Sequence, residues 1–593
     1  MMKRFLVVVT LALVSMAGAA QNFRANLDES VKPGDDFWQY AVGGWLKTHP
    51  LDKEHPMNGA FVDLEEQNNQ RINDLIMMYA GKKDLPQGSD GQKIGALYRL
   101  YMDSVGRNKM GYEPILPYLK QVRAIKTREA AERMMQAEWT IEQRIGVKKL
   151  NQVDQRDPQK TNHLMTWEQL LQDFKGIDWI GYRDALKYPK DIDKVNVSQL
   201  EPLHEVEKVL AETSVEDLKA YMELHVVKAY SSYLSDAFTD CQFNAIAAIA
   251  GVQEQEPRWK RAVAVLSDNL GETIGKLYVA EYFPESSKQR VYRLVKDLQQ
   301  AFEERLKENT RMSDSTKAKA IEKLHAMHIN VGYPDKWQDM EKYIDIREND
   351  NLVENFIRIT QEMRQARIRE RWHKPVDRTR MPCSPQEVNA FYHPLYNSIN
   401  FPAAILQPPF FDPEADYVCN YGAVGTVIGH EMSHGFDDEG CLYDKDGNLV
   451  NWWTDDDKAK YDERTKVLAD WFSKQEAVPG LFVNGEKTLG ENIGDNGGLQ
   501  IAYRAYENRM KQEPLNTIDG FTPAQRFYLA YAHIWASNAT PEYIALGVDS
   551  DVHSPNIFRV NAALPMIDSW YDAFGVKPTD KMFIPKEQRA LVW

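Results

Sequence analysis

The chain has 593 residues, of which 43% are hydrophobic and 11% aromatic, and its formal net charge is −15. This composition is typical of a packed globular protein rather than a disordered or fibrous one, and the length favours two or more lobes. An acidic surface repels nucleic acid phosphates and anionic lipids, so neither is an expected partner.

The first twenty residues have the pattern of a secretory signal peptide. The basic pair Lys3 and Arg4 precedes the apolar run FLVVVTLALV, and the small residues AGAA follow at 17–20. The run is too short to span a bilayer, which takes ~20 residues. We therefore expect residues 1–20 to be removed and the protein to be exported, periplasmic or extracellular, with no membrane span. The alternative is a buried N-terminal helix.

The middle of the chain, residues 68–375, has helical periodicity and dense charge. Val291, Leu294 and Leu298 recur every three or four positions, which indicates an amphipathic helix. We expect a large, mainly helical lobe here. A shorter N-terminal segment, residues 21–67, is expected to pack on the C-terminal part.

The amino-acid composition changes after about residue 375. Proline, glycine and aromatic residues become frequent, as in NAFYHPLYNSINFPAAILQPPFFDP, which is typical of strands and turns. Helical patterns return before His434 and again from Glu491 to Met510. The chain is therefore expected to be mainly α with a smaller β part, and residues 376–593 to form a mixed lobe.

The segment VIGHEMSHGFDDEG places His430 and His434 four residues apart, with Glu431 directly after the first. Residues four apart lie on the same face of a helix, so both imidazoles can reach one point. Glu431 is rotated away, close enough to activate a water molecule but not to ligate. This is the pattern of HExxH zinc peptidases. The alternative is a pair of surface histidines on a solvated helix.

A catalytic zinc needs a third protein ligand and an open position. The metzincin extension is absent, because Asp437 and Gly440 stand where its glycine and histidine would be. A later helical segment offers Glu491, and Asp495 lies four residues on, on the same face. Asp495 and Asp437 could each accept the outward N–H of a ligating histidine. Spacing alone leaves open that Glu491 is a helix N-terminal carboxylate favoured by the dipole.

Six further motifs follow one another along most of the chain. They are KPGDDFWQYAVGGWLKTHPL, GYPDKW, NAFY, FPAAILQPPFF, GENIGDNGGL and DVHSPNIFRVNAAL. Together with the HExxH segment they resemble the neprilysin/endothelin-converting-enzyme family of zinc metallopeptidases. The chain is similar to the bacterial, exported branch, since most of the cysteines that staple the animal members are missing.

The resemblance implies roles at the metal. The zinc ligands would be His430, His434 and Glu491. Glu431 would be the general base, and Asp437 and Asp495 would orient the ligating imidazoles. His553 matches the residue that stabilises the transition state. Without the family, His553 would be an ordinary loop histidine.

The resemblance also implies how substrate is held. Asn389 and Ala390 match the strand that hydrogen-bonds the peptide backbone, and Arg559 matches the arginine that grips the substrate beyond the cleaved bond. The apolar pocket for the residue after that bond would be lined by Ile405, Phe410, Val427 and Trp535. Without the family, Asn389 would be a turn residue, Arg559 a surface ion-pair partner and the apolar side chains plain core.

The resemblance as a whole implies that the protein is an exported zinc endopeptidase. It would be an oligopeptidase that takes short peptides and prefers a hydrophobic residue on the amino side of the new product. It would hold one Zn²⁺ per chain and act as a monomer. A thermolysin-like zinc lobe and a helical cap lobe would enclose a chamber. Two alternatives stay open at this point: a non-catalytic peptide-binding or adhesion protein of the same fold, and an exopeptidase of the same zinc class.

Overall fold

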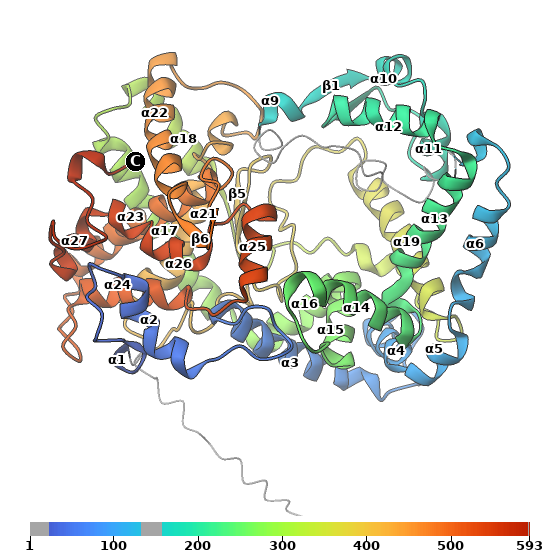
Figure 1. Cartoon of the computed structure of the whole chain (residues 1–593), viewed down its shortest axis with the longest axis horizontal. Coiled ribbons are helices and arrows are strands. Elements are labelled where there is room, and N and C mark those ends of the chain that lie inside the picture. The colour runs from blue at the N-terminus through green and yellow to red at the C-terminus, as the bar shows by residue number, and fades with distance from the viewer. Residues whose placement is uncertain (1–22, 132–133, 135–156, 591, 593) are drawn as a thin grey trace, which may run out of the picture.

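The computed structural model describes residues 23–131, 134, 157–590 and 592. The expected signal peptide, residues 1–20, lies outside these. In Figure 1 the described helices form two groups side by side: the first two helices, in dark blue, and the orange to red C-terminal elements share one group, and the later blue, the cyan and most of the green helices form the other. The expectation of a mainly helical chain with few, short strands is confirmed.

The N-terminal helices pack on the C-terminal part of the chain. Helix α1 (Phe23–Asn26) is followed by α2 (Phe37–Thr48), which begins where Asp36 accepts the Gln39 N–H. The ring of Phe37 meets Phe574 edge-on at 4.8 Å, and it is fully buried. Helix α3 (Ala60–Ala80) then leads into the other group.

Part of the second group has its own hydrophobic core, in which Val206, Met222 and Leu234 are at most 1% exposed, and the rest shares the core of the C-terminal part. A small antiparallel sheet, β1 (His163–Thr166) with β2 (Lys194–Val197), lies at its edge. Its helices are α4 (Asp90–Met102), α5 (Ser104–Met110), α6 (Leu116–Arg123), α9 (Pro158–Thr161), α10 (Trp167–Asp173), α11 (Trp179–Ala185), α12 (Leu200–Glu212), α13 (Val215–Tyr230), α14 (Asp236–Ala250), α15 (Arg258–Asn269), α16 (Gly271–Tyr282) and α19 (Leu352–Arg371).

Three consecutive elements from the middle of the chain pack with the C-terminal part instead. They are α17 (Glu285–Glu308), α18 (Asp314–Ala326) and β3 (His328–Gly332). Strand β3 pairs in parallel with β5 (Ser398–Pro402), whose other side pairs with the edge strand β4 (Phe391–His393). This pairing crosses the expected division at residue 375, which stays a prediction. The amphipathic pattern of 291–302 predicts a buried face, which is observed, but not which lobe covers it.

The rest of the C-terminal part is helical. Its helices are α20 (Tyr417–Asn420), α21 (Thr426–Ser433), α22 (Asp455–Phe472), α23 (Leu489–Gln512), α24 (Pro523–Ile534), α25 (Pro541–Ser550), α26 (Asn556–Asn561) and α27 (Asp568–Phe574), with a small hairpin of β6 (Glu476–Val478) and β7 (Leu481–Phe482). Helix α21 is buried along its whole length, and so is the first half of α23. The four cysteines of the chain are all unpaired.

Candidate metal centre and active site

Helices α21 and α23 approach each other at backbone distance. A Cβ atom on Gly429 would lie 2.9 Å from the Cα of Gly498, and one on Gly498 would lie 2.4 Å from the carbonyl oxygen of Thr426. Only glycine permits this approach, since real Cβ atoms do not come so close to backbone. The crossing brings Glu491, on the first turn of α23, to the end of α21 that carries His430.

Three donor atoms converge at this crossing. The Nε2 atoms of His430 and His434 are 2.9 Å apart, and their rings are nearly perpendicular. Oε2 of Glu491 lies 3.2 Å from the first nitrogen and 3.6 Å from the second. This carboxylate oxygen is buried and accepts no well-formed hydrogen bond. Two nitrogen lone pairs and a buried anionic oxygen facing one point suit a zinc ion, so the residues present fit the metal.

The outward nitrogens of both imidazoles are held by carboxylates. Nδ1 of His430 lies 2.9 Å from Oδ1 of Asp495, and Nδ1 of His434 lies 2.7 Å from Oδ2 of Asp437. A carboxylate that accepts the Nδ1–H fixes the ring and leaves the Nε2 lone pair for a metal. Both aspartates are 4% exposed, so these contacts are shielded from water.

The field at this point is strongly negative. Burial alone would lower the pKa of His434, but the carboxylates of Glu491 and Asp437 outweigh it and raise that pKa well above its ordinary value. The pKa of His430 is also raised, against burial and the neighbouring imidazole, by Asp495 and Glu491. The raised pKa values of both histidines show that the surrounding carboxylates favour a positive charge at this point.

Glu431 borders the same point from the cleft side. One of its carboxylate oxygens lies within 4.8 Å of a ring nitrogen of each of His430 and His434. The cleft has a volume of about 320 Å³. Of the expected site residues, the cleft is lined by Asn389, Ala390, His430, Glu431, His434, Asp437, Glu491 and His553. Asn389 and Ala390 directly precede the edge strand β4, whose outer side pairs with no other strand of the described residues.

His553 lies at the rim of the cleft with its side chain 44% exposed. Its Nε2 is 3.0 Å from Oε2 of Glu491, and its Nδ1 is 2.8 Å from Oδ1 of Asp551. Burial opposes its charge, yet these two carboxylates raise the pKa of His553 to about 9, so it is an imidazolium at neutral pH. Asp551 was missed by the sequence reasoning, although it stands two residues before His553 in the DVHSP motif.

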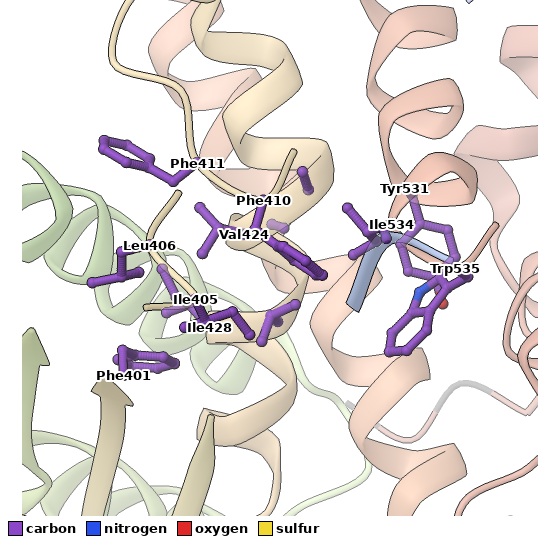
Figure 2. Close-up of a cluster of buried hydrophobic side chains, with 14 of the residues drawn as sticks. Phe401, Ile405, Leu406, Phe410, Phe411, Val424, Ile428, Tyr531, Ile534 and Trp535 are labelled. Atoms are coloured by element: carbon purple, nitrogen blue, oxygen red, sulfur yellow. The ribbon is translucent and has the colours of Figure 1, made fainter. Parts of the chain in front are cut away.

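The expected pocket residues lie away from the lining of this cleft, in a hydrophobic cluster. Phe410 and Ile405 are at most 1% exposed, and Val427 and Trp535 at most 8%. Figure 2 shows Phe410 beside Val424, and Trp535 next to Ile534 and Tyr531, within the same cluster. The ring of Phe61, from α3, lies 4.5 Å from Phe410 and 5.5 Å from Trp535. Sequence reasoning missed Phe61, since no motif marks it.

Arg559 is also buried rather than exposed to the cleft. Its Nε donates to Oδ2 of Asp495 at 2.8 Å and its Nη2 to Oδ1 at 2.6 Å. Its guanidinium carbon lies 3.8 Å from the centre of the Trp535 ring. One arginine thus joins a residue of the expected pocket to a carboxylate that orients His430.

Comparison with known proteins gives consistent matches along the chain. Models of peptidase family M13 match residues 389–590 and, for the N-terminal part, residues 33–140 and 125–334. Neprilysin-11 of Caenorhabditis elegans is 32% identical over 97% of this chain and 80% of its own length. Endothelin-converting enzyme 1 of Mus musculus is 29% identical over 97% and 86%. The Mycobacterium tuberculosis zinc metalloprotease Zmp1, solved in complex with an inhibitor, superposes with a TM-score of 0.87 at 30% identity, covering 96% of this chain and 98% of that chain.

Proposed function

Because the chain belongs to peptidase family M13 and is therefore a zinc metalloendopeptidase, we propose that it is an exported oligopeptidase that cleaves short peptides before hydrophobic residues. Its two-lobed, mainly helical fold is that of its solved relatives. The observation that carries the proposal is the buried Oε2 of Glu491, which faces both Nε2 atoms of the HExxH histidines.

The metal ligands we propose are Nε2 of His430, Nε2 of His434 and Oε2 of Glu491. A zinc ion held there supplies Lewis acidity, which polarises a carbonyl group and makes water more acidic. Asp495 and Asp437 keep the protons of the two imidazoles on Nδ1, so that the Nε2 lone pairs stay available. The two buried aspartates therefore act through ring orientation rather than on substrate.

Glu431 is proposed as the general base. Its carboxylate takes a proton from the attacking water and returns it to the amine that leaves. His553, charged at neutral pH, donates from Nε2 to the oxygen that becomes negative during attack, and Asp551 holds its Nδ1–H. Both side chains line the cleft, which supports these roles.

Strand β4 supports the proposed mode of substrate binding. An extended peptide can add to its free edge by main-chain hydrogen bonds, beginning at Asn389 and Ala390. The apolar cluster around Phe410 and Trp535 supports the preference for a hydrophobic residue after the cleaved bond. Arg559 is proposed to meet the substrate from its place against Asp495. The second, mainly helical group, which lies beside the group that carries the cleft (Figure 1), supports a limit to short peptides.

Export is proposed from the basic, apolar and small-residue pattern of residues 1–20. Among the described residues, no helix combines the length and the apolar character that crossing a bilayer requires. The protein would then act in the periplasm or outside the cell.

The test is an internally quenched peptide with both ends blocked, in a series that varies the residue after the cleaved bond. The proposal expects cleavage before Leu or Phe over Asp, loss of cleavage with a chelator, and recovery with Zn²⁺. Product masses separate internal cleavage from release of end residues. Cleavage that survives both the chelator and Glu431→Gln contradicts the proposal.

A further inference from the structure

A lysine is fully buried beneath the loop that follows the zinc helix. Lys323, on α18, is 1% exposed, and its Nζ donates to the carbonyl oxygens of Gly440 and Tyr443, both at 2.7 Å. The ammonium also lies 5.6 Å from the ring centre of Phe436. Among the residues that the structure describes, no carboxylate forms an ion pair with it. Burying an ammonium without a counter-ion costs several kcal/mol. A lysine at this buried position is therefore expected to serve a purpose that offsets this cost.

The loop that Lys323 holds is the one that carries Asp437. Oδ1 of Asp437 accepts the backbone N–H of Gly440 at 2.6 Å and that of Glu439 at 2.9 Å, and its Oδ2 faces Nδ1 of His434 at 2.7 Å. Gly440 is thus the shared point: its N–H donates to the aspartate and its carbonyl accepts from the lysine. Loss of the lysine leaves the Gly440 carbonyl with the Tyr443 N–H, at 3.1 Å, and without its shorter, charged donor.

Gly440 also closes the loop against the end of α21. A Cβ atom there would lie 1.8 Å from the carbonyl oxygen of His434, so the chain returns in direct backbone contact. Burial lowers the pKa of Lys323 to about 8, which leaves the ammonium the main form at neutral pH. A charged donor makes stronger hydrogen bonds to carbonyl groups than a neutral one.

We propose that Lys323 is a positioning residue of the active site, which fixes residues 437–443 so that Asp437 keeps His434 turned with Nε2 toward the metal. The inference rests on the proposed role of His434 as a zinc ligand. The proposal gives helix α18 a part in metal binding, although Lys323 belongs neither to the HExxH motif nor to the lining of the cleft.

The experiment measures the Zn²⁺ dissociation constant, by chelator competition, together with kcat and KM on the quenched peptide. Lys323→Met keeps the length of the side chain and removes the charge. Outer contacts to metal ligands are worth roughly 10–100-fold in affinity or activity, and we expect a weakening of Zn²⁺ binding in that range. With saturating Zn²⁺, KM should stay close to that of the wild type.

Lys93→Met is the matched control. Lys93 is also 1% exposed and donates to a backbone carbonyl, that of Glu341 at 2.8 Å, but it lies on α4, away from the metal centre. We expect Lys93→Met to lower the melting temperature while the Zn²⁺ dissociation constant stays within about twofold of wild type. An equal, purely thermal effect of both variants overturns the inference.

A double-mutant cycle tests the route of the effect. If Lys323 acts through Asp437, then adding Lys323→Met to Asp437→Asn should change Zn²⁺ affinity far less than it does in the wild type. Additive losses contradict this route. If Lys323→Met does not fold, Lys323→Arg, which keeps the charge but displaces the donors, enters the same cycle. Failure of the wild type to bind Zn²⁺ or cleave peptide would instead refute the proposed function.

Discussion

Arg559 and Asp495 form a buried two-point ion pair, with Nε to Oδ2 at 2.8 Å and Nη2 to Oδ1 at 2.6 Å. The same Oδ1 lies 2.9 Å from Nδ1 of His430. The two oxygens of one carboxylate thus connect the arginine expected to hold substrate with a proposed zinc ligand. A substitution of Arg559 should therefore weaken both substrate binding and Zn²⁺ binding.

Replacing Arg559 with Gln leaves Asp495 buried with only part of its partners. Breaking a buried ion pair in this way costs about 3–5 kcal/mol, so we expect a lower melting temperature, together with weaker Zn²⁺ binding and a higher KM. Arg589→Gln is the control, because Arg589 is likewise buried and paired, with Asp568, far from the cleft. Loss of stability without any effect on Zn²⁺ affinity in both variants would contradict the connection.

Glu431→Gln should separate metal binding from the reaction. The amide keeps the size of the side chain but cannot take a proton, and general-base assistance is worth about 10²–10⁴-fold in rate. We expect kcat to fall by that factor while zinc content stays at the wild-type level. Glu439→Gln, at another carboxylate that lines the cleft, should leave kcat within about threefold. If both substitutions lowered kcat equally, the assignment of Glu431 as the general base would be contradicted.

His553→Gln should lower kcat by about 10²–10³-fold, the usual effect of deleting a donor to a developing oxyanion. KM and zinc content should change little, since His553 lies at the rim and its charge matters mainly in the transition state. Asp551→Asn should give a smaller loss, because the imidazole remains but its Nδ1–H loses an anionic partner. A normal kcat in His553→Gln would refute the assignment.

The buried imidazole of His533 should make the folded protein less stable in acid. Burial lowers the pKa of this imidazole, which packs edge-on against Phe23, to about 4 in the folded protein. The unfolded chain, with a pKa near ~6.5, takes up the proton first, so this stability is complete above about pH 6.5 and is lost as the pH falls toward about 4. The cost at pH 5 is about 2 kcal/mol. The wild type should therefore lose more stability than His533→Gln between pH 7.5 and pH 5, as measured by urea midpoints. An equal loss in both would contradict the assignment.

Much of the metal centre follows from local sequence. Four-residue spacing on one helix predicts that His430 and His434 face one point, and their Nε2 atoms are 2.9 Å apart. The helix expected from Glu491 to Met510 is observed as α23, Leu489–Gln512. Glu491 could not be assigned from spacing alone, because its nearness to His430 depends on contacts between Gly429 and Gly498 that no periodicity reveals.

The arrangement of the lobes was harder to predict for a similar reason. Amphipathic periodicity shows that α17 buries one face, but its partners, like the parallel pairing of β3 with β5, are set by segments distant in sequence. The same holds for Phe61, which reaches the pocket cluster from the N-terminal helices. The roles proposed for Ile405, Phe410, Val427 and Trp535 stay predictions.

The most direct test of whether His430, His434 and the distant Glu491 converge on one ion is the zinc content per chain. It is measured on purified wild type and on Glu491→Gln prepared in parallel. The wild type should retain about one zinc ion per chain after exhaustive dialysis. The variant should lose most of it while staying folded, because two imidazoles alone bind zinc far more weakly than they do with a carboxylate. A folded wild type without zinc, or a Glu491→Gln protein that keeps a full complement, would contradict the account.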